Sequence, residues 1–208
     1  MKVLIRQAIL DVLNQMETDC ATDEFAYLSA TSKVEAPFRD RMAFNLHRRL
    51  AHTEAIVARE WTPKGSRKRI DIAILNGDAT PHTLIELKAM YSFDALRGGE
   101  NSLGTFEINV KKDMEKAVKV CAPNVPQVMG LLLACHVGTT IPEYLTRVVK
   151  YASDINDAYV RHGEKISEMV QEKAPRALAP LSIVRYGEIL SGRVFKISPR
   201  VMYWLVEV

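Results

Sequence analysis

The sequence has few cysteines, no long hydrophobic run and no strong excess of charge of either sign. Its 208 residues include three cysteines without paired spacing, which fits a reducing compartment and argues against a disulfide framework or a zinc cage. No apolar run is long enough to cross a bilayer. The basic start of the chain is interrupted by Asp11, Asn14 and Gln15, so it resembles an amphipathic helix more than a signal peptide. We therefore expect a cytoplasmic protein.

Charge and histidine content give no direct indication of a partner. A net charge of +3 is too small to establish binding to nucleic acid, so local clustering of basic residues must decide. Apolar residues make up 48% and charged residues 25%, which predicts a globular fold, and the length suits one domain. Five histidines have no metal-ligand spacing, and we interpret them as structural or surface residues: His47, His52, His82, His136 and His162.

Hydrophobic periodicity predicts the first half of the fold. Apolar residues at helical spacing predict one helix over 2–18 and another over about 36–51. Three strand-like segments follow at 55–61, 69–75 and 82–88, joined by the turn-rich sequences PKGSRK and NGDATP. This pattern predicts a meander of three antiparallel strands.

The next two elements connect to this meander. A helix is predicted at about 105–121, after a glycine-rich loop at 97–104. The segment at 128–137 is nearly all apolar, as a strand covered on both faces would be. Since a helix separates it from the third strand, the two strands are expected to pair in parallel.

The C-terminal part is predicted to add helices and a hairpin. Helical spacing predicts helices over 142–152 and 154–172, and two strand-like segments at 181–189 and 192–208 predict a hairpin. The fold class is therefore α/β. We expect one domain over 1–208, with a core at about 35–137 and a C-terminal extension at about 138–208.

Charged residues interrupt two of the predicted strands. TLIELKAM (83–90) contains Glu86 and Lys88, and RIDIAIL (69–75) contains Asp71. Because side chains alternate between strand faces, all three can project to one side of the sheet if the strands are hairpin neighbours. Two adjacent carboxylates repel, and a hard divalent cation removes that conflict. Mg²⁺ takes carboxylate, water and phosphate oxygens, so two acids and a lysine suit hydrolysis of a phosphodiester.

A purely structural interpretation of these charges is also open. Half-exposed antiparallel strands alternate apolar and charged residues routinely, so Glu86 and Lys88 would then be solvated neighbours and Asp71 a surface acid. The predicted helix before the strands and the crossover after them favour a functional site.

The sequence Asp71, followed 15 residues later by Glu86-Leu87-Lys88, resembles the PD-(D/E)xK signature of restriction-endonuclease-like nucleases. The order of helix, three-strand meander, helix and strand over about 35–137 is similar to the core of that superfamily. The resemblance implies an Mg²⁺-dependent nuclease, in which Mn²⁺ would substitute and DNA is the expected substrate. It implies that Asp71 and Glu86 are metal ligands, that the Leu87 carbonyl is a third ligand, and that Lys88 is catalytic.

The resemblance also implies a further glutamate on the helix before the meander. Glu35 is our candidate for this catalytic and metal-binding position, because it lies one turn before Phe38 and continues the face that packs onto the sheet. An acid near a helix N-terminus is also stabilised by the macrodipole without any catalytic role. Asp40 on the same helix and Glu60 on the first strand are alternatives.

Basic residues are clustered where they could contact a phosphate backbone. The loop between the first two strands and the helix after the motif would supply salt-dependent affinity that is independent of sequence. A basic turn that only solubilises the protein is the alternative. A nuclease needs basic residues around its active site because its own acids repel DNA. The candidate nucleic-acid-binding residues are Lys64, Arg67, Lys68, Arg69, Lys112 and Lys116.

Two other functions are compatible with the sequence. The chain could be a non-catalytic nucleic-acid-binding or assembly module that retains the nuclease fold, although the presence of all three motif side chains disfavours this. It could also be a structural partner protein that associates through the helix at 154–172. A homodimer is possible, since many nucleases of this class cut both strands as dimers. The sequence leaves open whether DNA or RNA is the substrate.

Overall fold

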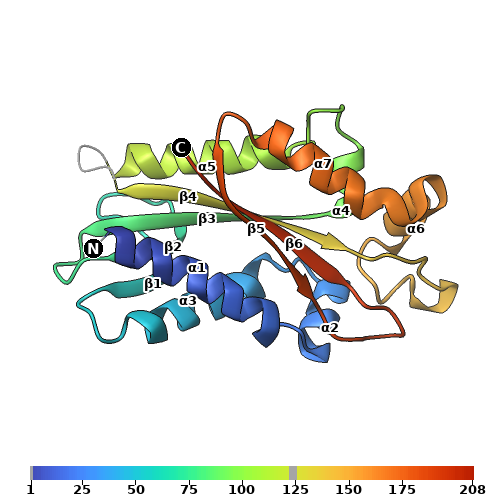
Figure 1. Ribbon diagram of the computed structural model, residues 1–208, viewed down its shortest axis with the longest axis horizontal. Coiled ribbons are helices and arrows are strands. Elements are labelled where there is room, and N and C mark those ends of the chain that lie inside the picture. Colours follow the sequence, from blue (N-terminus) through green and yellow to red (C-terminus); the bar gives the residue numbers. More distant parts are fainter. Residues whose placement is uncertain (1, 122–125) are drawn as a thin grey trace.

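The computed structural model describes residues 2–121 and 126–208, and a six-stranded sheet lies at its centre (Figure 1). The strand order is β1-β2-β3-β4-β6-β5, and every neighbouring pair is antiparallel except β3 and β4. The protein therefore has a mixed α/β fold. The strands are β1 (Ile56–Trp61), β2 (Ile70–Leu75), β3 (Pro81–Tyr91), β4 (Gln127–His136), β5 (Ser182–Leu190) and β6 (Arg200–Glu207).

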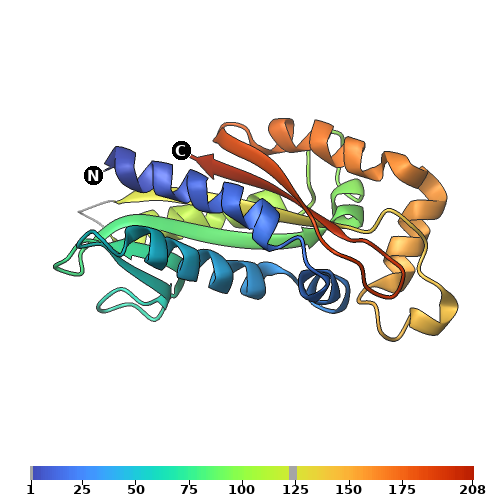
Figure 2. The same ribbon diagram turned by 60° about the horizontal axis from the view of Figure 1, so that its bottom comes forward.

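Helices cover both faces of this sheet (Figures 1 and 2). On one face lie α1 (Lys2–Asp19) and α3 (Glu35–Leu50), and on the other lie α5 (Phe106–Val120) and α7 (Ile166–Leu178). The remaining helices gather at one end of the sheet: α2 (Asp23–Thr31), α4 (Ser92–Leu96), α6 (Ala152–His162) and the single-turn 3-10 helices η1 (Glu143–Leu145) and η2 (Gly163–Lys165). Within the described residues, no helix has both the length and the apolar character needed to cross a bilayer.

Strand alternation divides the interior into two main apolar layers. Ile85 and Leu87 of β3 pack in the layer beneath α1 and α3, whereas Leu84 and Met90 pack in the layer beneath α5 and α7. A third cluster, which includes Tyr91, fills the end of the sheet near α2, α4 and α6. Glu86 and Lys88 therefore emerge on the α5 side of the sheet.

The predicted meander and crossover are confirmed. Ile72 of β2 lies opposite Ile85 of β3 in an antiparallel register, and Leu87 of β3 lies beside Leu131 of β4 in a parallel one. The helices predicted over 2–18, 36–51 and 105–121 match α1, α3 and α5 to within two residues. The apolar segment predicted as a strand covered on both faces is β4, whose residues are buried after Gln127.

Two helix predictions in the C-terminal part are wrong. Of the segment 142–152, only the last residue, Ala152, belongs to an α-helix, as the first residue of α6. The rest forms η1 and irregular turns, because the β-branched residues after η1 are poor helix formers and the backbone of Ile141 bonds to the side chain of Asn156. The single helix predicted over 154–172 is split into α6 and α7. Gly163 separates them with a positive φ of 59°, a conformation that ends a helix.

Two features were absent from the sequence predictions. One is α2, which begins where Thr22 Oγ1 accepts a hydrogen bond from the backbone N–H of Phe25 at 3.2 Å. The other is where the C-terminal hairpin joins the fold. The hairpin itself was predicted, and it is confirmed as β5 and β6. Because β6 pairs with β4 as well as with β5, the hairpin extends the central sheet.

Candidate active site

A cavity of about 290 Å³ lies between β2, β3 and α5, on the α5 side of the sheet. Asp71, Glu86 and Lys88 all line it, so the structure brings together the three charged side chains of the sequence motif. Asp113 and Lys116 of α5 line it from the opposite wall.

Asp71 lies where β2 and β3 separate. The backbone pairing of β2 with β3 ends at Ile72 and Ile85. Beyond this pair, the Asp71 carboxylate contacts β3. Its Oδ2 atom accepts a hydrogen bond from the Leu87 N–H at 2.8 Å, and its Oδ1 atom lies 3.8 Å from Nη1 of Arg39. The carboxylate is thereby fixed against the edge of β3.

Glu35 is fixed against the same edge by the first turn of α3. Its Oε2 atom accepts a hydrogen bond from the Ala89 N–H at 2.9 Å. Backbone N–H groups two residues apart on a strand point to the same edge, so Asp71 at Leu87 and Glu35 at Ala89 follow one another along β3. The sequence could indicate that Glu35 faces the sheet, but only the folded arrangement shows this contact.

The two alternatives to Glu35 have other partners. Asp40 forms ion pairs with Arg39 and Arg59, at 2.9 and 2.6 Å. Glu60 forms ion pairs with Arg39 at 3.0 Å and with Arg69 at 3.5 Å. None of the three acids lines the cavity, but Glu35 is the one whose carboxylate contacts β3 beside the motif.

Glu86 is buried next to Asp71. Glu86 is only 7% exposed. Its pKa is raised to about 9, mainly by burial and then by the charge and hydrogen bond of Asp71 and the charge of Asp113. At neutral pH the metal-free protein therefore holds a proton on this carboxyl. A buried acid beside a half-buried one is a donor set that a divalent cation fits, because the cation neutralises both.

Lys88 is held by an acid that sequence reasoning missed. Its Nζ atom lies 2.8 Å from Oδ2 of Asp113. Burial lowers the pKa of Lys88, but the hydrogen bond and charge of Asp113, with the charges of Glu35 and Asp71, outweigh burial and raise it overall. Lys88 is therefore a cation at neutral pH.

The residues that could hold a metal ion are few. Across the described part of the chain, no group of three or more His, Cys, Asp and Glu side chains forms a ready-made metal cage. Asp71 and Glu86 supply two carboxylates, and the Leu87 carbonyl faces the same edge of β3 as its N–H. Mg²⁺ commonly uses one or two protein carboxylates and completes its shell with water and phosphate oxygens, so this set suits Mg²⁺.

The predicted basic residues fall into two groups. Lys68 and Arg69 at the end of the β1–β2 loop and Lys116 on α5 line the cavity. The other three, Lys64, Arg67 and Lys112, are exposed and lie outside its lining.

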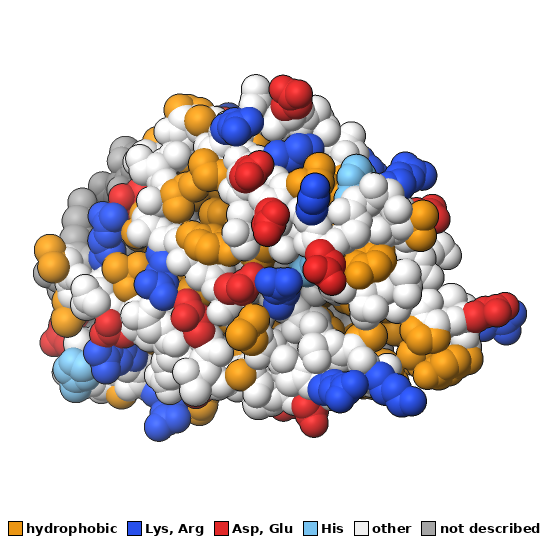
Figure 3. Space-filling view, turned by 45° about the vertical axis from the view of Figure 1, so that its right-hand side comes forward, with side chains coloured by type: hydrophobic (Ala, Val, Ile, Leu, Met, Phe, Trp, Pro, Cys, Tyr) orange, Lys and Arg blue, Asp and Glu red, His pale blue; other side chains and the backbone are white. Residues whose placement is uncertain are grey.

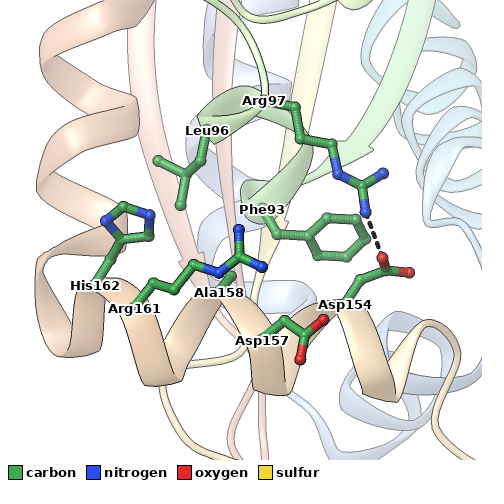
Figure 4. A pocket seen from close by; sticks show the side chains of 8 residues that line it. All are labelled: Phe93, Leu96, Arg97, Asp154, Asp157, Ala158, Arg161 and His162. Atoms are coloured by element: carbon green, nitrogen blue, oxygen red, sulfur yellow. Dashed lines mark hydrogen bonds and ion pairs between the residues drawn. The ribbon is translucent and has the colours of Figure 1, made fainter.

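A second cavity, of about 160 Å³, lies between α4 and α6 and contains none of the predicted site residues (Figure 4). Arg97 forms an ion pair with Asp154 and lies over the Phe93 ring, 5.1 Å from its centroid. Arg161 points from α6 into the space beneath Leu96 (Figure 4). The Arg97–Asp154 pair ties α4 to α6 at the end of the sheet, and we interpret this cavity as part of the packing there.

Comparisons with protein-family models, with curated proteins and with solved structures find no match. The site is therefore defined by its own geometry. Two adjacent acids, a paired lysine and a cationic rim meet in one cavity of a mixed α/β fold, and a third acid, Glu35, lies outside its lining along the same edge of β3.

Proposed function

We propose that the protein is a metal-dependent nuclease that hydrolyses phosphodiester bonds of nucleic acid, with DNA as the expected substrate. The observation that carries this proposal is the burial of Glu86 beside Asp71, with Lys88 in the same cavity. Burying a carboxylate beside a second carboxylate is costly unless a cation or a proton joins them.

Each residue of the site has a role in this proposal. Asp71, Glu86 and the Leu87 carbonyl would hold Mg²⁺, with Mn²⁺ as a substitute, and Glu35 would complete the acidic edge of β3. When bound, the metal ion supplies positive charge at the phosphate and an acidified water. Lys88 is kept protonated by its acidic neighbours, so it acts as a cation that stabilises the charge on the phosphate.

The rim of the cavity supplies affinity for the substrate backbone. Lys68, Arg69 and Lys116 line the cavity beside the acids, where they can neutralise phosphate charges that the acids would repel. Such contacts carry little sequence information, so we expect binding that weakens steeply with salt. A homodimer would allow both strands of double-stranded DNA to be cut.

The order of elements supports a place in the restriction-endonuclease-like superfamily. Helix α3 precedes the antiparallel strands β1, β2 and β3, and α5 then leads to β4, which is parallel to β3. This order and the Asp71…Glu86-Leu87-Lys88 spacing are the features that the PD-(D/E)xK resemblance requires. The three cysteines are free, which fits a nuclease of the reducing cytoplasm.

Cleavage of a small panel of substrates tests the proposal. Plasmid, linear duplex, single-stranded DNA and RNA are incubated with Mg²⁺, with Mn²⁺ or with a chelator. We expect metal-dependent cleavage by the parental protein and a loss on the order of 10²–10³-fold for Lys88→Ala, because the variant lacks a cation that acts on the developing charge. Binding of DNA should be largely retained.

The control is Lys165→Ala, which removes an exposed lysine of η2 outside the cavity and should cleave at the parental rate. A Lys88→Ala protein that cuts as fast as the parent would disprove the role of Lys88. A parental protein that binds DNA but cleaves no substrate would instead be a non-catalytic binding module.

A further inference from the structure

Asp113 is bound to two lysines of the proposed site. Its Oδ2 atom lies 2.8 Å from Nζ of Lys88, and its Oδ1 atom forms an ion pair with Lys116 one turn along α5. The Asp113 side chain is 18% exposed and lines the same cavity as Asp71 and Glu86. One carboxylate therefore sets the separation between a lysine from β3 and a lysine from α5.

The position of Asp113 on α5 is unusual for a charged residue. It lies three residues after Val110 and four before Ala117, and both of these are buried against the sheet. A carboxylate on the inward face of a helix is costly unless it has a partner, and Lys88 is that partner. The pair forms across the contact between α5 and β3.

Besides Asp113, Lys88 can pair with acids that the proposed reaction needs for metal binding. Its ammonium group ends a flexible four-carbon chain, and the charges of Glu35 and Asp71 both act on it. Without Asp113, Lys88 would still feel the charges of Glu35 and Asp71, which are among the acids that are to hold the metal ion. Asp113 keeps the ammonium group on the α5 side of the cavity.

We propose that Asp113 is the positioning residue of this site, which holds the ammonium group of Lys88 beside the phosphate position and away from the metal-binding acids. This inference rests on the proposed function and adds a residue that the sequence motif does not contain. Asp113 acts through Lys88 and need not touch the substrate.

If Asp113 positions Lys88, its removal should lower the turnover rate without weakening DNA binding, because Asp113 is itself an anion that repels phosphate. Asp113→Asn keeps the shape of the side chain but removes the charge that holds Lys88. We expect kcat to fall on the order of 10- to 100-fold, as for a misplaced catalytic group. The KM and the Kd for duplex DNA should stay unchanged or decrease, because a repulsive charge is gone.

The test measures kcat, KM and DNA affinity of the full chain with duplex DNA and Mg²⁺, for the parent and three variants. Asp113→Glu keeps the charge and should recover part of the lost kcat. Glu115→Gln removes an exposed acid of the same helix that does not line the cavity, and it should match the parent. Thermal unfolding of each variant shows whether the fold is retained.

Three results would overturn the inference. They are an Asp113→Asn protein with the parental kcat, a loss of kcat that Asp113→Glu does not restore in any part, and a fall in kcat matched by weaker DNA binding and a lower Tm. If the parent cleaves and Lys88→Ala does not, such a result removes only the role of Asp113. If the parent cleaves nothing, the proposed function fails as well.

Discussion

At the scale of single residues, the motif could be predicted from the sequence because strand alternation is a local rule. Glu86 and Lys88 are two residues apart, so any strand places them on one face, and a hairpin brings Asp71 to the same side. Asp113 could not be found in this way. Its partner is 25 residues earlier on another element, and only the packing of α5 against β3 brings the two together.

The helical spacing nevertheless contained a signal for Asp113. Val110, Met114 and Ala117 are buried at helical spacing on one face of α5, and that face also includes position 113. A charged residue among buried helix positions calls for a partner, just as Glu86 does within its strand. The need for a partner to Asp113 therefore indicates a charged group on the sheet beneath this helix, and Lys88 of β3 is that group.

His136 is a buried residue whose titration can be tested away from the proposed site. It is 1% exposed, its Nδ1 atom lies 2.9 Å from Ser92 Oγ, and burial, with the charge of Arg200, lowers its pKa to about 4. An unfolded imidazole has a pKa near 6.5, so between about pH 6.5 and 4 the unfolded chain binds a proton that the folded protein does not. Stability therefore falls as the pH is lowered through this range.

We expect His136→Asn to reduce that dependence. The free energy of unfolding is measured in urea at several values between pH 7 and 4, and the variant should show a shallower decline than the parent, even if it is less stable at pH 7. His52→Asn, which changes an exposed histidine, serves as the control and should follow the parental slope. Equal slopes for His136→Asn and the parent would contradict the assignment.

At the scale of elements, prediction succeeded where the pattern was long and regular and failed where tertiary contacts decided. The predicted helix over 142–152 illustrates the failure. There Asn156 bonds to both backbone polar groups of Ile141, and the Lys150 N–H donates to Ala30 O at 2.8 Å. Ala30, far away in the sequence, thus accepts the Lys150 N–H that a helix would have paired with the carbonyl four residues earlier.

The placement of α5 depends on a glycine in β4. A Cβ atom added to Gly130 would lie 2.7 Å from Val110 Cγ1, 2.7 Å from Met114 Sδ and 3.0 Å from Val206 Cγ2. These distances are shorter than van der Waals contact, so Gly130 allows α5 to approach the sheet closely enough for Asp113 to reach Lys88. The sequence shows this glycine within an apolar strand, but not the helix that packs on it.

We expect Gly130→Ala to destabilise the protein by about 1–3 kcal/mol, the usual cost of overpacking a core, and to reduce cleavage by displacing α5. Urea unfolding measures the first effect, and the substrate assay measures the second. Gly99→Ala is the matched control, because its Cβ would have no neighbour within 4 Å. A Gly130→Ala protein as stable as the control would show that the α5–β4 contact is looser than described.

At the scale of the whole molecule, the sequence suggests a core at 35–137 and a separate C-terminal extension, whereas the sheet contains strands from both parts. The motif-bearing core at 35–137 ends just after β4, and the C-terminal segment looked like an appended hairpin. In the structure β6 lies between β4 and β5, and its residues 201–206 are all buried. The edge of β4 that β6 covers would otherwise expose unpaired backbone groups and both apolar layers.

The motif-bearing core should therefore be unable to fold without its C-terminal hairpin. We expect a chain ending at residue 180 to lack a cooperative unfolding transition and to bind a hydrophobic dye, because it loses two adjoining strands and the buried Tyr203 and Trp204. The control is a chain ending at Glu207, which lacks only the exposed Val208 and should melt as the parent does. Circular dichroism and thermal unfolding of both proteins measure the difference. A cooperative transition in the shorter chain would mean that β1 to β4 are stable by themselves, and that the site on β2 and β3 does not depend on the strands beyond β4.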